Sequence, residues 1–147
     1  MADRTESRIV VQARPADVLN VIADFASYPR WTGAVREATV VHTGVDGRAE
    51  QVRFVLDTRA LRDEYTLAYR WQIAGDGQGE LTWSLVRAQV LTAMDGSYRL
   101  AAVPGGTEVT YTLTVDLRLP ILGMLRRKAE KVIIDTALSE LKRHVEG

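Results

Sequence analysis

Apolar and polar residues alternate along several stretches of the chain. Over residues 65–73 every odd position is large and apolar, whereas the even positions are small or polar. Residues 52–56, 81–85 and 109–117 repeat this pattern. A period of two is typical of a β-strand with one buried face and one hydrated face. The chain is therefore expected to form several half-buried strands.

Turn signals rich in glycine lie between the alternating stretches. They occur at residues 44–47, 75–79, 95–96 and 104–106. Glycine adopts the positive φ that tight hairpins require, and aspartate tolerates it. Short strands separated by such turns predict an antiparallel meander.

Two regions have helical spacing instead. The first is Pro15–Asp24, with proline in its first turn, followed by a short turn over Ser27–Trp31. The second is expected from Pro120 to about Val145, and would be about 40 Å long. Its predicted inner stripe consists of Leu122, Leu125, Ala129, Val132, Ile133, Thr136, Ala137 and Leu141.

The order of these elements predicts an α+β fold. A strand is followed by two short helices, about six further strands and one long helix. One apolar face of the sheet needs cover, and the long C-terminal helix is available to supply it. We expect a single domain, residues 1–147, in which a curved antiparallel sheet of about seven strands wraps around that helix.

Composition narrows the classes of function. Lys and Arg total 19 and Asp and Glu total 19, and this balance argues against nucleic acid as the main partner. Cysteine is absent, which excludes disulfides and thiolate chemistry. We find neither an N-terminal signal segment nor an apolar run long enough to span a bilayer, so a cytoplasmic location is expected. His42 and His144 have no acidic residue at metal-ligand spacing, and we expect no metal and no other cofactor.

Several short segments carry a resemblance to a known family. Residues 15–18 read Pro-Ala-Asp-Val, residues 21–25 read Val-Ile-Ala-Asp-Phe, and residues 28–31 read Tyr-Pro-Arg-Trp. Together with segments 96–100 and 106–111 and the terminal helix, they resemble the START-related, Bet v 1-like (SRPBCC) superfamily. Within it the chain is most similar to the polyketide cyclase/dehydrase-like branch of actinobacterial type.

The resemblance implies a helix-grip fold with a cavity between the concave sheet face and the last helix. It also implies an apolar ligand, such as a lipid, an isoprenoid or quinone, or a polyketide. It does not transfer a catalytic set, so a cyclase or hydrolase activity would rest on analogy of fold alone.

Aromatic residues dominate the predicted inner face of the sheet, where Tyr111 is also expected to point. Such rings either fill a core or line a cavity, and for the group as a whole the resemblance favours a lined cavity. Trp31 either fastens the short helices to the sheet or lies at the pocket rim. The residues expected to contact the ligand are Trp31, Phe54, Leu56, Tyr65, Tyr69, Trp71, Trp83, Tyr98, Leu125, Ala129 and Ile133.

Charged residues between the predicted strands allow two interpretations. The cluster Asp57, Arg59, Arg62, Asp63 and Glu64 is expected to form a hydrated hairpin with local ion pairs. Alternatively it forms a polar cavity mouth, in which Arg59 or Arg62 binds a carboxylate or phosphate group.

Other polar positions give weaker hypotheses. Either Glu37 or Arg87 would be a catalytic or ligand-binding candidate if its side chain pointed inward, because a buried charge needs a partner. The basic run 126–128 is expected to be hydrated, with transient contact to an anionic membrane as the alternative. Gly123 weakens the helix, and we hypothesise that it lets the first helical turn open as a lid.

Three functions follow from these observations. The leading hypothesis is a binder or carrier of an apolar small molecule, because no catalytic set is recognisable. The second is a polyketide-type cyclase/dehydratase that holds a reactive chain in one conformation. The third is an interaction module with a collapsed cavity. Polar groups converging deep in the pocket would favour chemistry, and an almost wholly apolar pocket would favour carriage. The sequence defines no oligomeric state.

Overall fold

A single antiparallel sheet forms most of the protein. The computed structural model describes residues 4–58, 62–118 and 122–147. The seven strands of the sheet are β1 (Thr5–Val11), β2 (Val35–Thr43), β3 (Ala49–Asp57), β4 (Arg62–Ile73), β5 (Gly79–Ala88), β6 (Leu91–Val103) and β7 (Gly106–Leu117). The order in the sheet is β1-β7-β6-β5-β4-β3-β2, so β2 to β7 pair consecutively, β1 pairs with β7, and β1 and β2 are the two edge strands. The consecutive pairing of β2 to β7 confirms the predicted meander.

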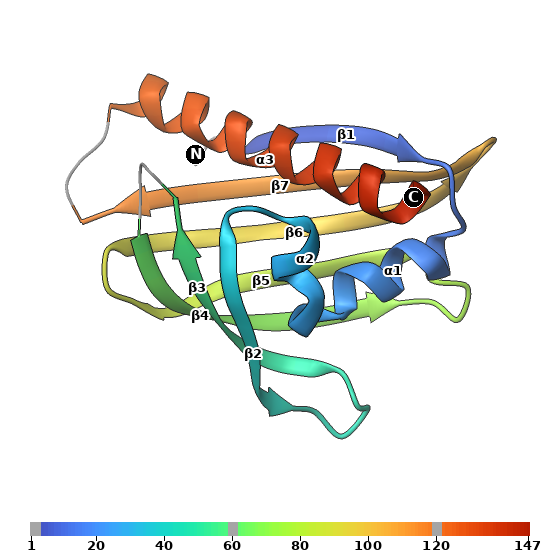
Figure 1. Ribbon diagram of the computed structural model, residues 1–147, viewed down its shortest axis with the longest axis horizontal. Helices are drawn as coiled ribbons and strands as arrows, with labels where there is room; N and C mark the ends of the chain where they lie inside the picture. The colour runs from blue at the N-terminus through green and yellow to red at the C-terminus, as the bar shows by residue number, and fades with distance from the viewer. Residues whose placement is uncertain (1–3, 59–61, 119–121) are drawn as a thin grey trace.

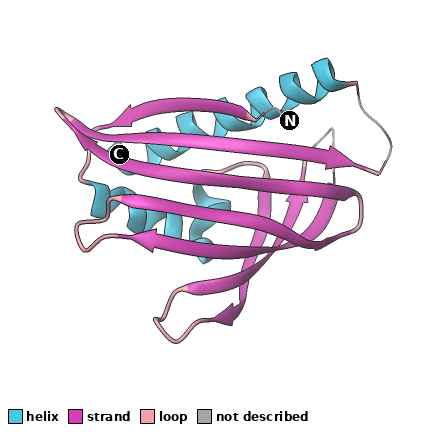
Figure 2. Cartoon of the chain, turned by 180° about the vertical axis from the view of Figure 1, so that it is seen from behind, coloured by secondary structure: helices cyan, strands magenta, loops and turns pink. Residues whose placement is uncertain are grey.

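All helices lie on one face of the sheet, which Figure 2 shows from the opposite side. The short elements are α1 (Pro15–Ala23), the 3-10 turn η1 (Phe25–Ser27) and α2 (Tyr28–Trp31). The long helix α3 (Gly123–Glu146) lies along β1 and β7 (Figure 1). Its predicted start, Pro120, falls outside the described residues. The fold is therefore the α+β helix-grip arrangement that the sequence predicted.

Helix α1 is fastened to the sheet by its apolar stripe. Val18 and Ile22 are completely buried, as their spacing of four residues predicts. The β4–β5 turn approaches the start of α1 closely, since a Cβ on Gly77 would lie 2.4 Å from the Ala16 nitrogen. Gly77 has a φ of +92°, so this position suits glycine on both counts. The turn and the helix thus hold each other in place.

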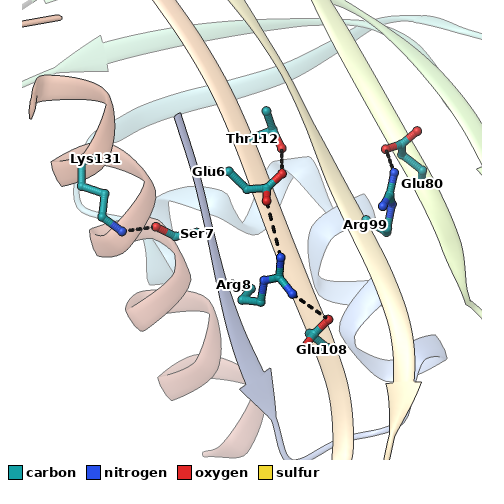
Figure 3. A network of polar contacts seen from close by, with 8 residues as sticks. All are labelled: Glu6, Ser7, Arg8, Glu80, Arg99, Glu108, Thr112 and Lys131. Carbon is teal, nitrogen blue, oxygen red and sulfur yellow. Dashed lines mark hydrogen bonds and ion pairs between the residues drawn. The ribbon is translucent and has the colours of Figure 1, made fainter. Parts of the chain in front are cut away.

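The convex face of the sheet is polar. Arg8 on β1 lies 3.6 Å from Glu6 and 4.0 Å from Glu108, and Arg99 lies 3.4 Å from Glu80 on the neighbouring strand (Figure 3). These pairs are largely exposed and contribute little to stability. They keep this face hydrated, whereas the helices of the described residues cover the concave face (Figure 2).

The predicted turn at Asp95–Gly96 is wrong, because both residues lie inside β6. Gly96 is opposite Trp83 on β5, and a Cβ there would lie 2.6 Å from Cζ2 of the Trp83 ring. Asp95 accepts a hydrogen bond from the Leu85 amide at 2.9 Å, where β5 is no longer paired with β6. Gly96 therefore leaves room for the indole of Trp83, and Asp95 supplies an acceptor for a backbone amide that strand pairing leaves unbonded.

The predicted inner stripe of α3 is only partly correct. The helix buries Glu130, Ile134, Leu138 and Leu141, and of the predicted stripe only Leu141 is fully buried, with Ala137 partly buried beside it. The other predicted members, Leu122, Leu125, Ala129, Val132, Ile133 and Thr136, are exposed. The reason is Glu130. Because a glutamate lies at the centre of the stripe that is buried, the neighbouring stripe is more apolar, and the sequence pattern wrongly indicates that this neighbour faces the core.

Glu130 joins α3 to the edge of the sheet. Its side chain is completely buried, and its two oxygens accept hydrogen bonds from Thr5 Oγ1 and from the Val115 amide, both at 2.6 Å. Val115 lies two residues beyond Leu113, the last β7 residue paired with β1. The carboxylate therefore satisfies a strand N–H that β1 is too short to reach.

Candidate functional site

Six aromatic side chains meet on the concave face and form what we call the aromatic cluster: Phe54, Tyr65, Tyr69, Trp83, Tyr98 and Tyr111. They come from β3 to β7, and alternation along each strand points them all to the helix side. Neighbouring rings touch, with centroids 5.5 Å apart for Phe54 and Tyr65 and 4.5 Å apart for Tyr98 and Tyr111. The predicted inward orientation is confirmed, and the rings pack against one another.

Trp83 lies at the centre of the aromatic cluster. Its ring contacts Tyr69, Tyr98 and Tyr111 at centroid distances of 5.8, 5.3 and 5.7 Å. The side chain is 7% exposed, and its Nε1 is buried without a hydrogen-bond partner. A buried N–H without an acceptor costs about 1–3 kcal/mol. Trp83 thus presents on the concave face a donor for which no described residue supplies an acceptor.

The tyrosine hydroxyls add further unused donors. Within the described residues, Tyr28 is the one tyrosine whose hydroxyl is hydrogen-bonded, donating to the Ile22 carbonyl at 2.5 Å. The hydroxyls of Tyr65, Tyr69, Tyr98 and Tyr111 have no such partner within that part of the chain. Four phenols therefore share the concave face with the free N–H of Trp83.

These phenols stay protonated at neutral pH. Burial raises the pKa of Tyr65 and Tyr98 well above the ordinary value for tyrosine, and the neighbouring Tyr111 raises it further. The cluster supplies neutral hydrogen-bond donors.

Two other predicted aromatic contacts have structural partners. Trp71 Nε1 donates to the Ala49 carbonyl at 2.7 Å, and Arg48 lies 5.2 Å above its ring. Trp31 packs on Tyr28 and stacks with His144 at 6.2 Å, so it joins α2 to the end of α3. Trp31 also borders a hollow lined by residues of α1, α2 and His144, and its place at the rim of a ligand pocket stays a prediction.

Two hollows border the described part of the fold. The first, of about 340 Å³, is lined by Trp31 and His144 together with residues of α1, η1 and α2. The second, of about 200 Å³, includes Leu56 and lies at the ends of β3 and β4. Neither is lined by Tyr69, Trp83, Tyr98 or Tyr111. Neither of these two hollows therefore opens onto those four rings.

The charged cluster behaves as a hydrated hairpin over its described members. Arg62 Nε lies 2.9 Å from Asp57, and Glu64 lies 2.8 Å from Arg53 on the neighbouring strand. Asp63 instead is buried and accepts hydrogen bonds from three consecutive backbone amides, those of residues 89–91. Arg59, the other proposed head-group donor, lies outside the described residues.

The remaining polar candidates face solvent. Glu37 and Arg87 are both exposed, so neither has the inward-pointing side chain that a catalytic or ligand-binding role would require. His42 is exposed and lies 2.7 Å from Glu50, and His144 is exposed beside Trp31. Within residues 4–58, 62–118 and 122–147 no group of three or more His, Cys, Asp or Glu side chains could hold a metal ion. No helix in that part of the chain could cross a membrane.

Comparison with known proteins assigns the chain to a family. Residues 2–146 match the profile of the family described as polyketide cyclase / dehydrase and lipid transport. The chain belongs to this family. Its resemblance to the START-related superfamily, predicted from the segments around Asp24 and Trp31, is thereby confirmed. No curated protein sequence gives a significant match.

Several solved structures share the fold of this chain. A START superfamily protein from Mycobacterium smegmatis superimposes with a TM-score of 0.88 at 18% identity, covering 99% of this chain and 98% of that one. The Zhui aromatase/cyclase from Streptomyces sp. R1128 gives 0.76 at 14% identity, covering 98% and 93%. A STAR-related lipid transfer protein from Xanthomonas axonopodis gives 0.74 at 17% identity, covering 97% and 85%. At these identities the likeness establishes the fold alone.

Sequence reasoning missed parts of this site. The predicted ligand contacts omit Tyr111, although the alternation in β7 places it on the same face as Tyr98. The turn predicted at residues 95–96 is wrong for Gly96, which lies inside β6. No signal in the sequence distinguishes Tyr28, whose hydroxyl is bonded, from the four tyrosines whose hydroxyls have no partner within the described residues.

Proposed function

We propose that the protein binds a planar apolar molecule bearing carbonyl oxygens, on the concave sheet face beneath α3, and acts as its carrier. The observation that carries the proposal is the set of unpaired donors in the aromatic cluster, with the N–H of Trp83 at its centre. Flat rings and polar edges suit a conjugated ligand, because aromatic faces stack and N–H and O–H groups bind its oxygens. The predicted α3 contacts Leu125, Ala129 and Ile133 are exposed and lie outside the buried stripe of the helix, so they are not part of this proposal.

The chemistry of the donors narrows the class of ligand. An indole N–H donates only, and a phenol with a raised pKa remains protonated and available to donate. Carbonyl oxygens, as in quinones and polyketides, accept such bonds. A saturated acyl chain offers no acceptor along its length and would leave these groups unpaired. Among the ligands that the resemblance implies, the cluster therefore favours quinone-like or polyketide-like molecules.

A polyketide-type cyclase/dehydratase remains the second candidate, and the same donors favour it. Phenols that bind a carbonyl would also polarise it. Dehydration of a β-hydroxy ketone additionally needs a base to take the proton next to the carbonyl. Within the described residues, the buried carboxylates Asp63 and Glu130 are both held by hydrogen bonds to the protein. This absence of a free base makes carriage the better supported function.

Isothermal titration with two probes tests the proposal. We expect 1,8-dihydroxyanthraquinone to bind one molecule per chain, and palmitate to bind at least tenfold more weakly. Tyr98→Phe and Trp83→Phe each remove one donor and should weaken anthraquinone binding about tenfold, the effect of ~1.4 kcal/mol. Tyr28→Phe is the matched control, because its hydroxyl is already bonded to Ile22, and it should bind like the wild type.

Two results would overturn the proposal. One is the absence of binding by either probe. The other is unchanged anthraquinone affinity in both Trp83→Phe and Tyr98→Phe. Turnover is tested separately, by incubating the protein with a β-hydroxy ketone and following the loss of one water by mass spectrometry. Catalysed loss of water would assign the cluster to the cyclase/dehydratase role instead of carriage.

A further inference from the structure

The outer face of α3 carries a regular stripe of apolar and small side chains. Of the ten large apolar side chains that are exposed within the described residues, five lie between Leu122 and Ile133. Intervals of three and four residues alternate along this part of the helix and continue beyond it, through Leu122, Leu125, Ala129, Val132, Thr136 and Ser139. Such heptad spacing is typical of the seam along which one helix packs against another. We call these six residues the outer seam.

The outer seam points away from the sheet. At ~3.6 residues per turn, Leu125 and Val132 lie on the opposite side of the helix from Ile134, which is completely buried. Leu125 is 56% exposed and Val132 59%, and the other four members of the outer seam are also exposed. Figure 1 shows α3 at the outer boundary of the molecule. The whole seam is therefore open to a partner.

The sizes of the seam residues fit a second copy of the same helix that runs in the opposite direction. Such a pair has two-fold symmetry, so each contact occurs twice. With the symmetry axis between residues 130 and 131, each layer pairs a larger residue with a smaller one: Leu122 with Ser139, Leu125 with Thr136, and Val132 with Ala129. Large residues opposite small ones let facing layers interdigitate. A parallel pair would instead place leucine against leucine at one end and serine against serine at the other.

The charges beside the outer seam fit the same register. Lys128 has no ion-pair or hydrogen-bond partner within the described residues. Asp135 pairs with Lys131 of its own helix through Oδ1 at 3.2 Å, and its other carboxylate oxygen can accept from a further donor. In the antiparallel pair Lys128 lies beside Asp135 of the second copy, on both sides of the axis. Sliding one helix by a heptad toward the start of the other would bring the two copies of Lys128 together, so charge selects the same register as size does.

We propose that the protein forms a weak two-fold dimer through the outer seam, with the α3 helices of the two copies antiparallel. The helix dipoles favour this direction as well, because the positive start of each helix lies near the negative end of the other. The seam is short and partly polar, so the Kd should be on the order of 10 µM. It lies on the side of α3 that faces away from the sheet, so the proposal does not depend on the aromatic cluster or its ligand.

Sedimentation velocity over a series of protein concentrations tests the dimer on the full chain without ligand. The double variant Leu125→Ser with Val132→Ser should raise the Kd about tenfold or more. Lys128→Asp should raise it about fivefold, because the new carboxylate would lie beside Asp135 of the second copy. Adding Asp135→Lys to that variant reverses both charges and should restore association to the wild-type level.

Cysteine crosslinking tests the direction of the two helices, because the chain contains no cysteine of its own. In the antiparallel pair Leu125 lies beside Thr136 of the second copy, whereas the two copies of Leu125 lie roughly 16 Å apart along the helix axis. A mixture of Leu125→Cys chains with Thr136→Cys chains should therefore form a disulfide-linked pair on mild oxidation. Neither chain alone should do so, because a disulfide needs its two Cα atoms within about 7 Å.

A matched control uses Val40→Ser with Val41→Ser on β2, where the valines are 42% and 50% exposed and lie outside the seam. This variant should dimerise like the wild type, and circular dichroism should show that all variants remain folded. The proposal is overturned if the wild type stays monomeric well above the expected Kd, or if the Leu125/Val132 variant dimerises as well as the wild type. It is also overturned if Leu125→Cys crosslinks alone as readily as the mixture does. A monomeric chain that co-sediments with phosphatidylglycerol vesicles through Leu125 and Val132 would overturn it too, since the face would then bind a membrane.

Discussion

Glu130 offers the sharpest test of how α3 is held on the sheet. Its carboxylate is completely buried and accepts two hydrogen bonds, from Thr5 Oγ1 and from the Val115 amide. Replacing it with alanine leaves a strand N–H and a hydroxyl without acceptors beneath the helix. At roughly 1.5–3 kcal/mol for each bond to a charged group, Glu130→Ala should lower the free energy of unfolding by about 3–6 kcal/mol.

Glu130→Gln separates hydrogen bonding from charge. The glutamine oxygen can accept from the Val115 amide, and its NH₂ group can donate to Thr5 Oγ1, so both contacts persist. Because the buried charge is also removed, we expect this variant within about 1 kcal/mol of the wild type. Glu140→Ala is the control on the same helix, since within the described residues Glu140 accepts one exposed bond, of 3.2 Å, from the Gly33 amide.

Urea unfolding followed by tryptophan fluorescence measures these differences. A double-mutant cycle with Thr5→Val should give a coupling energy of about 1 kcal/mol between Thr5 and Glu130. The reasoning is refuted if Glu130→Ala is within 1 kcal/mol of the wild type. It is also refuted if Glu130→Gln is as unstable as Glu130→Ala, because hydrogen bonding would then not be the stabilising interaction.

Two further predictions concern the aromatic cluster. Gly96→Ala should destabilise by about 1–3 kcal/mol, because the new Cβ would lie 2.6 Å from the Trp83 ring. In calorimetry it should melt several degrees below Gly75→Ala, whose Cβ meets nothing within 4 Å, and equal melting temperatures would contradict the packing described. Burial raises the pKa of all five tyrosines, including Tyr69 and Tyr111. The folded state therefore keeps these protons to higher pH than the unfolded chain, whose tyrosines titrate near pH 10. The free energy of unfolding should be retained below about pH 10 and should fall as the pH rises above it. Tyrosinate absorbance that develops near pH 10 in protein that remains folded would contradict this prediction.

Much of the fold was predictable because its signals are local. Alternation in β4 and β7 identifies the buried face residue by residue, and the turns at Gly77 and Gly105 are real. The turn predicted at Asp95–Gly96 is wrong because the missing side chain of a glycine has two possible uses. It permits a hairpin turn, and it also leaves room for the indole of Trp83 on the neighbouring strand. Only the strand register distinguishes the two.

The phase of α3 was mispredicted for a related reason. A sequence pattern assigns glutamate to the surface, whereas Glu130 is buried because the edge of β7 has an unpaired N–H that needs an acceptor. That need arises from the length of β1, which lies more than a hundred residues earlier in the chain. The candidate site was predictable to the same extent. The inward direction of the aromatic rings follows from the alternation along each strand. Whether a tyrosine hydroxyl is hydrogen-bonded depends on acceptors from segments distant in the sequence.

The proposed function requires that the hydroxyls of Tyr65, Tyr69, Tyr98 and Tyr111 bind the ligand. NMR of protein labelled with ¹³C at tyrosine Cζ tests it directly, with the signals assigned by single Tyr→Phe variants. On saturation with 1,8-dihydroxyanthraquinone, we predict shifts for Tyr65, Tyr69, Tyr98 and Tyr111 and a constant signal for Tyr28, which already donates to Ile22. If the four signals stay unchanged while the ligand is bound, the ligand binds elsewhere and the account is wrong.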